Sequence, residues 1–214
     1  MRIAIIGAGE LGKAVIHHAV EDAGYEIAGF YDDFNTAAEF AGYPVLGKPS
    51  AIIEDFNSGK FDKIFIAIGY AQMAARTRYF RQFSDKVPMA NIIHSSSYVD
   101  PSCKIGEGVF LFPGCTLDFE VTLGDNVLLN TGVAIAHHSR VGANTFFGPG
   151  VTVAGLVDIG ESCFVGVGST IMDCLKIGNN STIGGGAVVI KDTPENSVSV
   201  GVPARVIKTK EIIF

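Results

Sequence analysis

Two adjacent histidines, His137 and His138, are the side chains of this sequence that best suit acid–base chemistry. An imidazole has an ordinary pKa of about 6.5, so it can remove a proton from an attacking nucleophile at neutral pH, typically for a gain of roughly 10²- to 10⁴-fold in rate. The other three histidines, His17, His18 and His94, stand in a predicted helix and a predicted connection. The pair therefore indicates a general base, with a surface position of no catalytic role as the alternative.

A glycine-rich segment near the start of the chain indicates an anion site. The apolar segment 2–6 runs into a GxGxxG pattern at 7–12, a helical pattern over 13–22, and a second strand over 25–31 that ends in Asp32-Asp33. In this context the glycines let the backbone approach a diphosphate at a helix N-terminus, and the acid accepts hydrogen bonds from a ribose hydroxyl. A turn without a ligand is the alternative. The predicted nucleotide-binding residues are Gly7, Ala8, Gly9, Asp32, Asp33 and Gly69.

An apolar residue recurs at every sixth position of the second half of the chain. Sixteen in a row would arise by chance on the order of once in 10⁴–10⁵ trials if about half of all positions were apolar. A period of six fits one short strand plus one turn, with one side chain pointing inward, and three such units close a triangular coil of 18 residues. The sixteen positions are Val99, Ile105, Leu111, Leu117, Leu123, Leu129, Ile135, Val141, Phe147, Val153, Ile159, Val165, Ile171, Ile177, Ile183 and Val189.

The repeat predicts a three-sided prism of stacked coils. Strands in neighbouring coils pair at roughly 4.8 Å, so residues 99 to about 193 make about five coils and a prism of roughly 25 Å. Small or polar residues between the inward positions, Ser169 and Ser181 among them, suit the tight corners. Because the repeat has no insertion, a binding site must be built from coil corners, a neighbouring subunit or the first domain.

The first domain is predicted to hold half of a dinucleotide-binding fold. A further strand over 63–69 precedes an Arg-rich helix over 72–83, and 44–47 supplies another strand, which gives a three- or four-stranded parallel sheet in about 85 residues. A full dinucleotide fold needs two such halves, so a nucleoside diphosphate is favoured over NAD. The expected domains are 1–90 and 91–214.

Together these motifs resemble the hexapeptide-repeat sugar O- and N-acetyltransferases related to sialic-acid O-acetyltransferase and UDP-4-amino-sugar N-acetyltransferase, over essentially all 214 residues. Residues 201–205, Gly-Val-Pro-Ala-Arg, are similar to the GxPA segment that ends such enzymes, and they are expected to cap the last coil. The resemblance implies an α/β half-Rossmann domain followed by a left-handed parallel β-helix. It also implies acetyl transfer from acetyl-CoA to a nucleotide-linked amino sugar in bacterial surface-glycan biosynthesis, by a homotrimer that binds the coenzyme between two subunits.

The same resemblance implies roles for particular residues. Asn130-Thr131-Gly132, with His137 five positions after the glycine, looks like the family's NTG…H segment. His137, or else His138, then takes the part of the base, and Asn130, stacked one coil below, positions the acceptor. An inward asparagine ladder is the structural alternative for Asn130. The residues that fall where the family contacts coenzyme A are Gly155, Val167 and Gly185.

The sequence departs from the family pattern in three places. Leu11 stands where the family commonly has a histidine in its glycine turn, and His138 stands where the base is often followed by a carboxylate. Phe146 replaces a histidine that contacts the coenzyme in some members. Asp118 and Glu120, on an earlier coil, are candidates to orient His138 in place of the missing carboxylate.

Composition narrows the remaining alternatives. A net charge of −6 with scattered Lys and Arg indicates neither a nucleic-acid nor a membrane-surface partner, and no stretch of 18 apolar residues occurs. The four cysteines lack CxxC spacing, so we expect buried, reduced thiols, no metal site and a cytoplasmic protein. Three other functions stay open: acetylation of a sugar hydroxyl, an NAD-linked oxidoreductase, and a non-catalytic β-helix scaffold.

Overall fold

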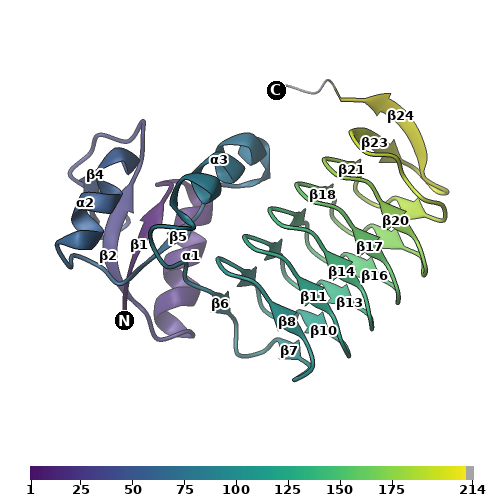
Figure 1. The fold of residues 1–214 in the computed structure, drawn as a ribbon, viewed down its shortest axis with the longest axis horizontal. Helices are drawn as coiled ribbons and strands as arrows, with labels where there is room; N and C mark the ends of the chain where they lie inside the picture. Colours follow the sequence, from purple (N-terminus) through teal and green to yellow (C-terminus); the bar gives the residue numbers. More distant parts are fainter. Residues whose placement is uncertain (211–214) are drawn as a thin grey trace. The chain divides into compact units, whose positions relative to one another are not determined.

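The computed structural model describes residues 1–210, and the chain divides into two compact units, Met1–Ile92 and a second that begins at Ile93. Figure 1 shows an α/β unit and a column of stacked coils. The last four residues of the expected second domain, 91–214, lie outside the described residues. Within the part of the chain that is described, no helix has the length and apolar character needed to cross a membrane.

The first unit is a five-stranded sheet in the order β3-β4-β2-β1-β5. Strands β4, β2, β1 and β5 pair in parallel, and only the short β3 runs antiparallel to its neighbour. The strands are β1 (Arg2–Ile6), β2 (Glu26–Tyr31), β3 (Glu39–Phe40), β4 (Tyr43–Gly47) and β5 (Lys63–Ile66), the helices are α1 (Glu10–Glu21), α2 (Ile52–Asn57) and α3 (Met73–Phe83), and 3₁₀ turns span Pro49–Ala51 and Tyr70–Gln72.

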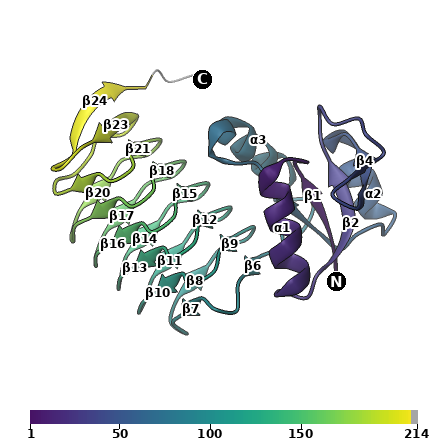
Figure 2. The same ribbon diagram turned by 180° about the vertical axis from the view of Figure 1, so that it is seen from behind.

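Helices cover both faces of this sheet. Helix α1 is faint at the back of Figure 1 and stands at the front in Figure 2, on the opposite side of the strands from α2. Ile6 packs in one buried cluster with Ile52 of α2 and Phe80 of α3. Ile5 is buried and points to the other face, where α1 buries Val15, because successive strand side chains alternate between faces.

Element boundaries differ from those expected in ways that shape the site. Helix α1 begins at Glu10 rather than at Lys13, so its first turn follows Gly9 directly. Strand β5 ends at Ile66, and residues 67–69 form a loop at its carboxyl end. Helix α2 was not anticipated, because six residues are too few to display a helical period.

The second unit is a parallel β-helix with three faces. Each strand pairs with the strands 18 residues before and after it, as Ile135 does with Leu117 and Val153. The first face contains β6 (Ile92–Ile93), β9 (Phe110–Leu111), β12 (Leu128–Leu129), β15 (Phe146–Phe147), β18 (Phe164–Val165) and β21 (Thr182–Ile183). The second face contains β7 (Tyr98–Val99), β10 (Thr116–Leu117), β13 (Ala134–Ile135), β16 (Thr152–Val153), β19 (Thr170–Ile171) and β22 (Val188–Val189). The third face contains β8 (Lys104–Ile105), β11 (Thr122–Leu123), β14 (Arg140–Val141), β17 (Asp158–Ile159) and β20 (Lys176–Ile177).

The predicted inward column is the core of this prism. All sixteen positions belong to the core cluster or pack against it, and only Val99 and Ile105 in the first coil are partly exposed. A second inward position, two residues earlier in each hexapeptide, was missed by the count in sixes. Ser169 and Ser181, expected at corners, occupy it; both are fully buried, and their hydroxyls donate to the carbonyls of Gly166 and Pro194. Small side chains fit there because each coil is narrow.

The segment after the last coil extends the first face. Strand β23 (Ser197–Val200) pairs in parallel with β21, and β24 (Arg205–Thr209) pairs with β23 in an antiparallel hairpin around residues 201–204. The hairpin therefore follows the stack at its C-terminal end, where an uncovered edge would invite pairing with another chain.

The three corners of the prism use different residues for the same backbone turn. At each corner one residue per coil has a positive φ, which glycine tolerates best and asparagine next. The glycine corner, between first and second faces, has Gly114, Gly132, Gly150, Gly168 and Gly186 there. The asparagine corner, between third and first faces, has Gly108, Asn126, Asn144, Ser162, Asn180 and Asn196. The histidine corner, between second and third faces, has Glu120, His138, Leu156 and Cys174.

This asymmetry predicts opposite effects of glycine at two corners. Leu156 is 54% exposed with φ 60°, so Leu156→Gly is expected to unfold with a free energy about 1 kcal/mol higher than Leu156→Ala, which keeps the strain. A Cβ on Gly150 (φ 65°) would meet no atom within 4 Å, so Gly150→Ala is expected to lose about 1 kcal/mol from backbone strain alone. Urea titrations followed by circular dichroism measure both; a Leu156→Gly protein less stable than Leu156→Ala would contradict the assignment of strain.

Candidate functional site

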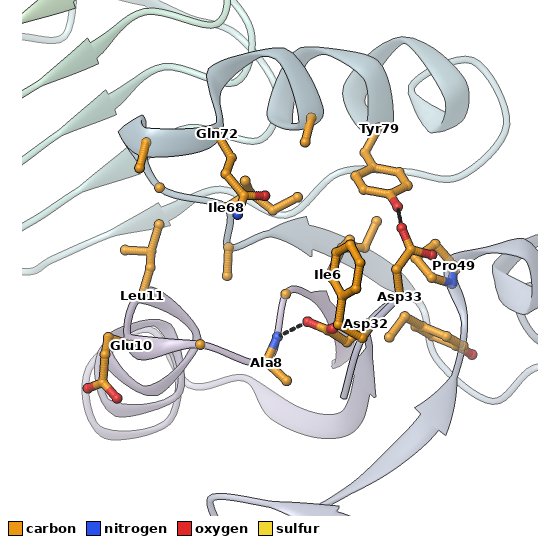
Figure 3. A pocket seen from close by; sticks show the side chains of 18 of the residues that line it. Ile6, Ala8, Glu10, Leu11, Asp32, Asp33, Pro49, Ile68, Gln72 and Tyr79 are labelled. Atoms are coloured by element: carbon orange, nitrogen blue, oxygen red, sulfur yellow. Dashed lines mark hydrogen bonds between the residues drawn. The ribbon is translucent and has the colours of Figure 1, made fainter. Parts of the chain in front are cut away.

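A cavity of about 460 Å³ opens at the carboxyl ends of the parallel strands of the first unit. Its walls come from the turn after β1, the end of β2, the loop after β5 and helix α3, and Figure 3 shows them around the labelled side chains. This is where ligands bind in open α/β sheets. The structure brings all six predicted nucleotide-binding residues to this one pocket: Gly7, Ala8, Gly9, Asp32, Asp33 and Gly69.

The three glycines of the turn have separate structural reasons. Gly7 has φ 110°, and a Cβ there would lie 2.8 Å from the carbonyl oxygen of Ala67. A Cβ on Gly12 would lie 2.5 Å from the Gly7 oxygen, so this glycine lets α1 pack closely on β1. At Gly9 the backbone is extended and a Cβ would meet nothing within 4 Å. Gly9 therefore leaves open space beside the first turn of α1, where a ligand can approach the backbone.

Asp32 is engaged by the chain itself. Its Oδ2 accepts the Ala8 N–H at 2.8 Å, and its Oδ1 accepts the N–H groups of Phe34 and Asn35 at 2.8 and 2.9 Å. Burial raises the pKa of this carboxyl, but the bonds from Ala8, Asn35 and Phe34 outweigh burial and lower the pKa below its ordinary value. The sequence predicted a ribose acceptor; the structure shows a carboxylate that ties the glycine turn to the end of β2.

Asp33 faces the opposite wall of the pocket. Its carboxylate accepts a hydrogen bond from the Tyr79 hydroxyl on α3, and the Arg78 guanidinium lies 3.8 Å from the same oxygen. Arg78 also lies over the Tyr79 ring, 4.7 Å from its centroid. Burial and the bond to Asp33 raise the pKa of Tyr79. Sequence reasoning missed Tyr79 and Arg78, although the Arg-rich character of segment 72–83 was the available signal.

A buried arginine supports the loop after β5. Arg76 on α3 is fully buried, and its Nη1 donates to the carbonyl oxygens of Ile66 at 2.8 Å and Ile68 at 3.3 Å. Burial lowers the pKa of Arg76 to about 9. The guanidinium holds residues 66–68 in place behind Gly69 and the pocket. No motif in the sequence distinguished Arg76 from its neighbouring arginines.

The two candidate bases meet at the histidine corner of the prism. His137 and His138 are both exposed, and their Nδ1 atoms lie 3.0 Å apart. The Nε2 atom of His138 lies 3.3 Å from Oε2 of Glu120, which occupies the equivalent place one coil below. The Phe119 ring meets the His138 ring edge to face, with centroids 5.4 Å apart. Of the two acids suggested to orient His138, the structure brings Glu120 to it.

Gly155 lies directly above the His137 ring. A Cβ on Gly155 would stand 2.6 Å from Cε1 and 2.7 Å from Nε2 of His137, so only glycine lets the imidazole lie flat against the next coil. Gly155 itself is buried. The backbone holds the pair from both sides, because His138 N–H donates to the Phe119 carbonyl and the His137 carbonyl accepts the Leu156 N–H.

The other predicted residues of the prism gather at the glycine corner. Asn130 follows β12, Val167 follows β18, and Gly185 follows β21, so all three lie in turns between first and second faces. Asn130 therefore does not lie one coil below His137; the pairing register puts Phe119 there. Asn130 Oδ1 accepts the Thr131 N–H. Val167 is 57% exposed and packs beneath Gly185.

The suggested asparagine ladder exists at the asparagine corner instead. Asn126 Nδ2 donates to Asn144 Oδ1 at 2.9 Å, and Asn180 Nδ2 donates to Asn196 Oδ1 at 2.9 Å. Phe146, the third departure from the family pattern, is buried with its ring 6.1 Å from that of Phe164.

The cysteines only partly follow the expectation of buried thiols. All four are free; Cys115 and Cys163 are buried, and burial raises the pKa of each to about 11. Cys103 is partly buried, and Cys174 is exposed at the histidine corner. Among residues 1–210, no cluster of three or more His, Cys, Asp or Glu side chains is arranged to hold a metal ion.

Comparison with known proteins identifies both units. Residues 2–83 match the family described as PglD N-terminal domain, and residues 120–155 and 157–191 match the bacterial transferase hexapeptide repeats. No curated protein sequence gives a significant match.

Solved structures extend the similarity to nearly the whole chain. PerB from Caulobacter crescentus, in complex with CoA and GDP-perosamine, is 32% identical with a TM-score of 0.90, over 97% of this chain and 98% of that chain. The acetyltransferase domain of PglB from Neisseria gonorrhoeae, in complex with acetyl coenzyme A, is 27% identical with a TM-score of 0.87, over 96% and 98%. WeeI from Acinetobacter baumannii is 27% identical with a TM-score of 0.82, over 97% and 100%.

These comparisons confirm the predicted fold, an α/β half-Rossmann domain followed by a left-handed parallel β-helix. They also decide between the open classes in favour of a transferase, rather than an oxidoreductase or a scaffold. The chain belongs to the hexapeptide-repeat sugar acetyltransferases that carry a PglD-type N-terminal domain.

Proposed function

We propose that this protein transfers the acetyl group of acetyl-CoA to the amino group of a nucleotide-linked amino sugar, with His137 as the general base. The observation that carries the proposal is the exposed His137–His138 pair at one corner of the prism, in a chain that also has a nucleotide-sized pocket in its first unit. The resemblance to PerB, whose structure contains CoA and GDP-perosamine, supports both substrates. The proposal includes a cytoplasmic location and a role in surface-glycan biosynthesis, as the family resemblance implies.

The nucleotide is proposed to bind along the glycine turn. The first turn of α1 offers backbone N–H groups and the positive end of a helix dipole, which favour a diphosphate. Leu11 provides no charge, but Arg78 brings a cation to the same cavity from α3. The sugar-linked diphosphate is therefore expected between the space beside Gly9 and Arg78, with Gly69 on the wall formed by the β5 loop.

The chemical step requires one proton acceptor. The amine nitrogen attacks the thioester carbonyl carbon, the carbon–sulfur bond breaks, and coenzyme A leaves as a thiol or thiolate. The proton that the nitrogen loses passes to Nε2 of His137, which makes no hydrogen bond within residues 1–210. Backbone N–H groups at the prism corners can stabilise the oxyanion without a dedicated side chain.

The active site is proposed to be shared between subunits of a homotrimer. His137 and Gly155 lie at the histidine corner, whereas Asn130, Val167 and Gly185 lie at the glycine corner of the same subunit. One face of six residues separates the corners by up to about 20 Å at the usual rise of a strand. Coenzyme A would contact both sets if the glycine corner of one subunit met the histidine corner of the next, which cyclic symmetry repeats three times.

Replacing His137 tests the base. We expect His137→Ala to lower kcat by roughly 10²- to 10⁴-fold with little change in the KM for either substrate, because the imidazole acts on the reacting proton. Thiol release from acetyl-CoA, measured with UDP-, GDP- and dTDP-linked 4-amino sugars and their hydroxyl counterparts, provides the assay. His17→Ala, an exposed histidine on α1, is the matched control. Full activity of His137→Ala would remove the assignment.

A methyl group at Gly9 tests the nucleotide pocket. The backbone of Gly9 suits any residue and its Cβ direction is empty, so Gly9→Ala is expected to fold with an unchanged Tm. If the diphosphate approaches there, the KM for the nucleotide sugar rises about tenfold or more, as expected from the loss of at least 1.4 kcal/mol of binding. The KM for acetyl-CoA should stay constant and is the internal control. An unchanged KM for the nucleotide sugar would move the site elsewhere.

Subunit mixing tests the shared site. His137→Ala and Gly185→Trp are each expected to be inactive, the second because the indole fills the coenzyme groove. Co-expression in equal amounts should restore about a quarter of wild-type activity, since a site between two subunits combines an intact His137 and an intact Gly185 with that frequency in a cyclic oligomer. Light scattering should show a trimer. Inactive mixed trimers would indicate that one subunit supplies both corners.

A further inference from the structure

Three residues at the histidine corner form a continuous line of polar contacts. Glu120, His138 and His137 are joined by 3.3 Å between Glu120 Oε2 and His138 Nε2 and by 3.0 Å between the two Nδ1 atoms. The sequence places a histidine where the family usually has a carboxylate after the base, and the structure brings a carboxylate to that histidine from the coil below. The arrangement is therefore a base, a second imidazole and an acid in series.

The order of donors along this line follows from the chemistry of each group. An ionised carboxylate only accepts hydrogen bonds, so the nitrogen that faces Glu120, His138 Nε2, is the one that carries hydrogen. In a neutral imidazole the other nitrogen is then an acceptor, which makes His138 Nδ1 the acceptor of the 3.0 Å contact. His137 Nδ1 must donate that bond. The remaining lone pair of His137 is thereby fixed on Nε2.

From this we infer that Glu120 and His138 are positioning residues that hold His137 in the tautomer with a basic Nε2. The inference rests on the proposed role of His137. When Nε2 takes the proton from the amine, the imidazolium forms with its Nδ1–H already directed at His138, and the negative charge of Glu120 stabilises the positive charge through the intervening ring. No further co-reactant is needed, because the relay only orients and polarises the base.

The backbone supports this reading independently. Glu120 and His138 both adopt positive φ, 56° and 58°, at the one corner where the turn residues are neither glycine nor asparagine in any coil. Such a conformation costs roughly 1 kcal/mol or more for a residue with a Cβ. Residues at equivalent places in successive coils stack above each other, so this turn position is what puts the Glu120 carboxylate beneath the His138 ring. Strain of this kind persists where the side chain has a function.

The first experiment removes the charge of Glu120 in the full-length enzyme. Glu120→Gln is expected to lower kcat about 10- to 100-fold, the usual effect of losing a carboxylate that orients a histidine, with both KM values unchanged. Moving the carboxylate next to the base, in Glu120→Gln/His138→Glu, should recover kcat to within about tenfold of wild type. Glu161→Gln, the same substitution at an exposed site on another corner, is the control and should match wild type.

The second experiment reads the tautomers without activity. Nitrogen-15 NMR of the imidazole rings should show hydrogen on Nδ1 of His137 and on Nε2 of His138 in the wild type, and loss of that preference at His137 in Glu120→Gln. Hydrogen on Nε2 of His137, or wild-type kcat in Glu120→Gln, would overturn the relay. Activity in His137→Ala would instead overturn the proposed base, so the two failures are distinguishable.

Discussion

Every chemical feature of the second unit depends on the strict 18-residue length of a coil. Because each strand pairs with its equivalents 18 residues away, turn residues stack in vertical columns at the three corners. Glu120, His138 and Leu156 form one such column, and Phe119, His137 and Gly155 form its neighbour. Contacts between residues that are distant in sequence thus arise from counting alone, with no loop to place them.

The first unit reaches the same end through backbone hydrogen bonds. Asp32 uses both of its oxygens to hold the glycine turn and the segment after β2, and Arg76 holds the loop after β5 by its carbonyl groups. Two charged side chains thus support the pocket, while the groups free to contact a ligand are the backbone near Gly9 and the exposed Arg78. Charge is used here to fix the shape of a site as much as to bind within it.

The sequence predicted what periodicity and short motifs can encode. The sixteen inward residues, the GxGxxG context and the gathering of its residues at one pocket follow from patterns of spacing. Asn130 illustrates the limit: its neighbourhood depends on which corner of the triangle it occupies, and counting in sixes without assigning faces put it beneath His137. Tyr79, Arg78 and Arg76 were missed because their partners, Asp33 and the β5 carbonyls, lie across the sheet, where no local pattern connects them.

The prism geometry also explains how a carboxylate can leave its usual position without leaving the site. A shift of 18 residues along the chain returns to the same corner one coil away, which is the displacement that separates Glu120 from His138. A shift of six would move the acid to another corner of the triangle, and a shift of one would turn its side chain away from the column. The fold therefore permits the acid only at discrete places, and His138, with a nitrogen at each end of its ring, is long enough to span the one-coil gap that a carboxylate at position 138 would not need to cross.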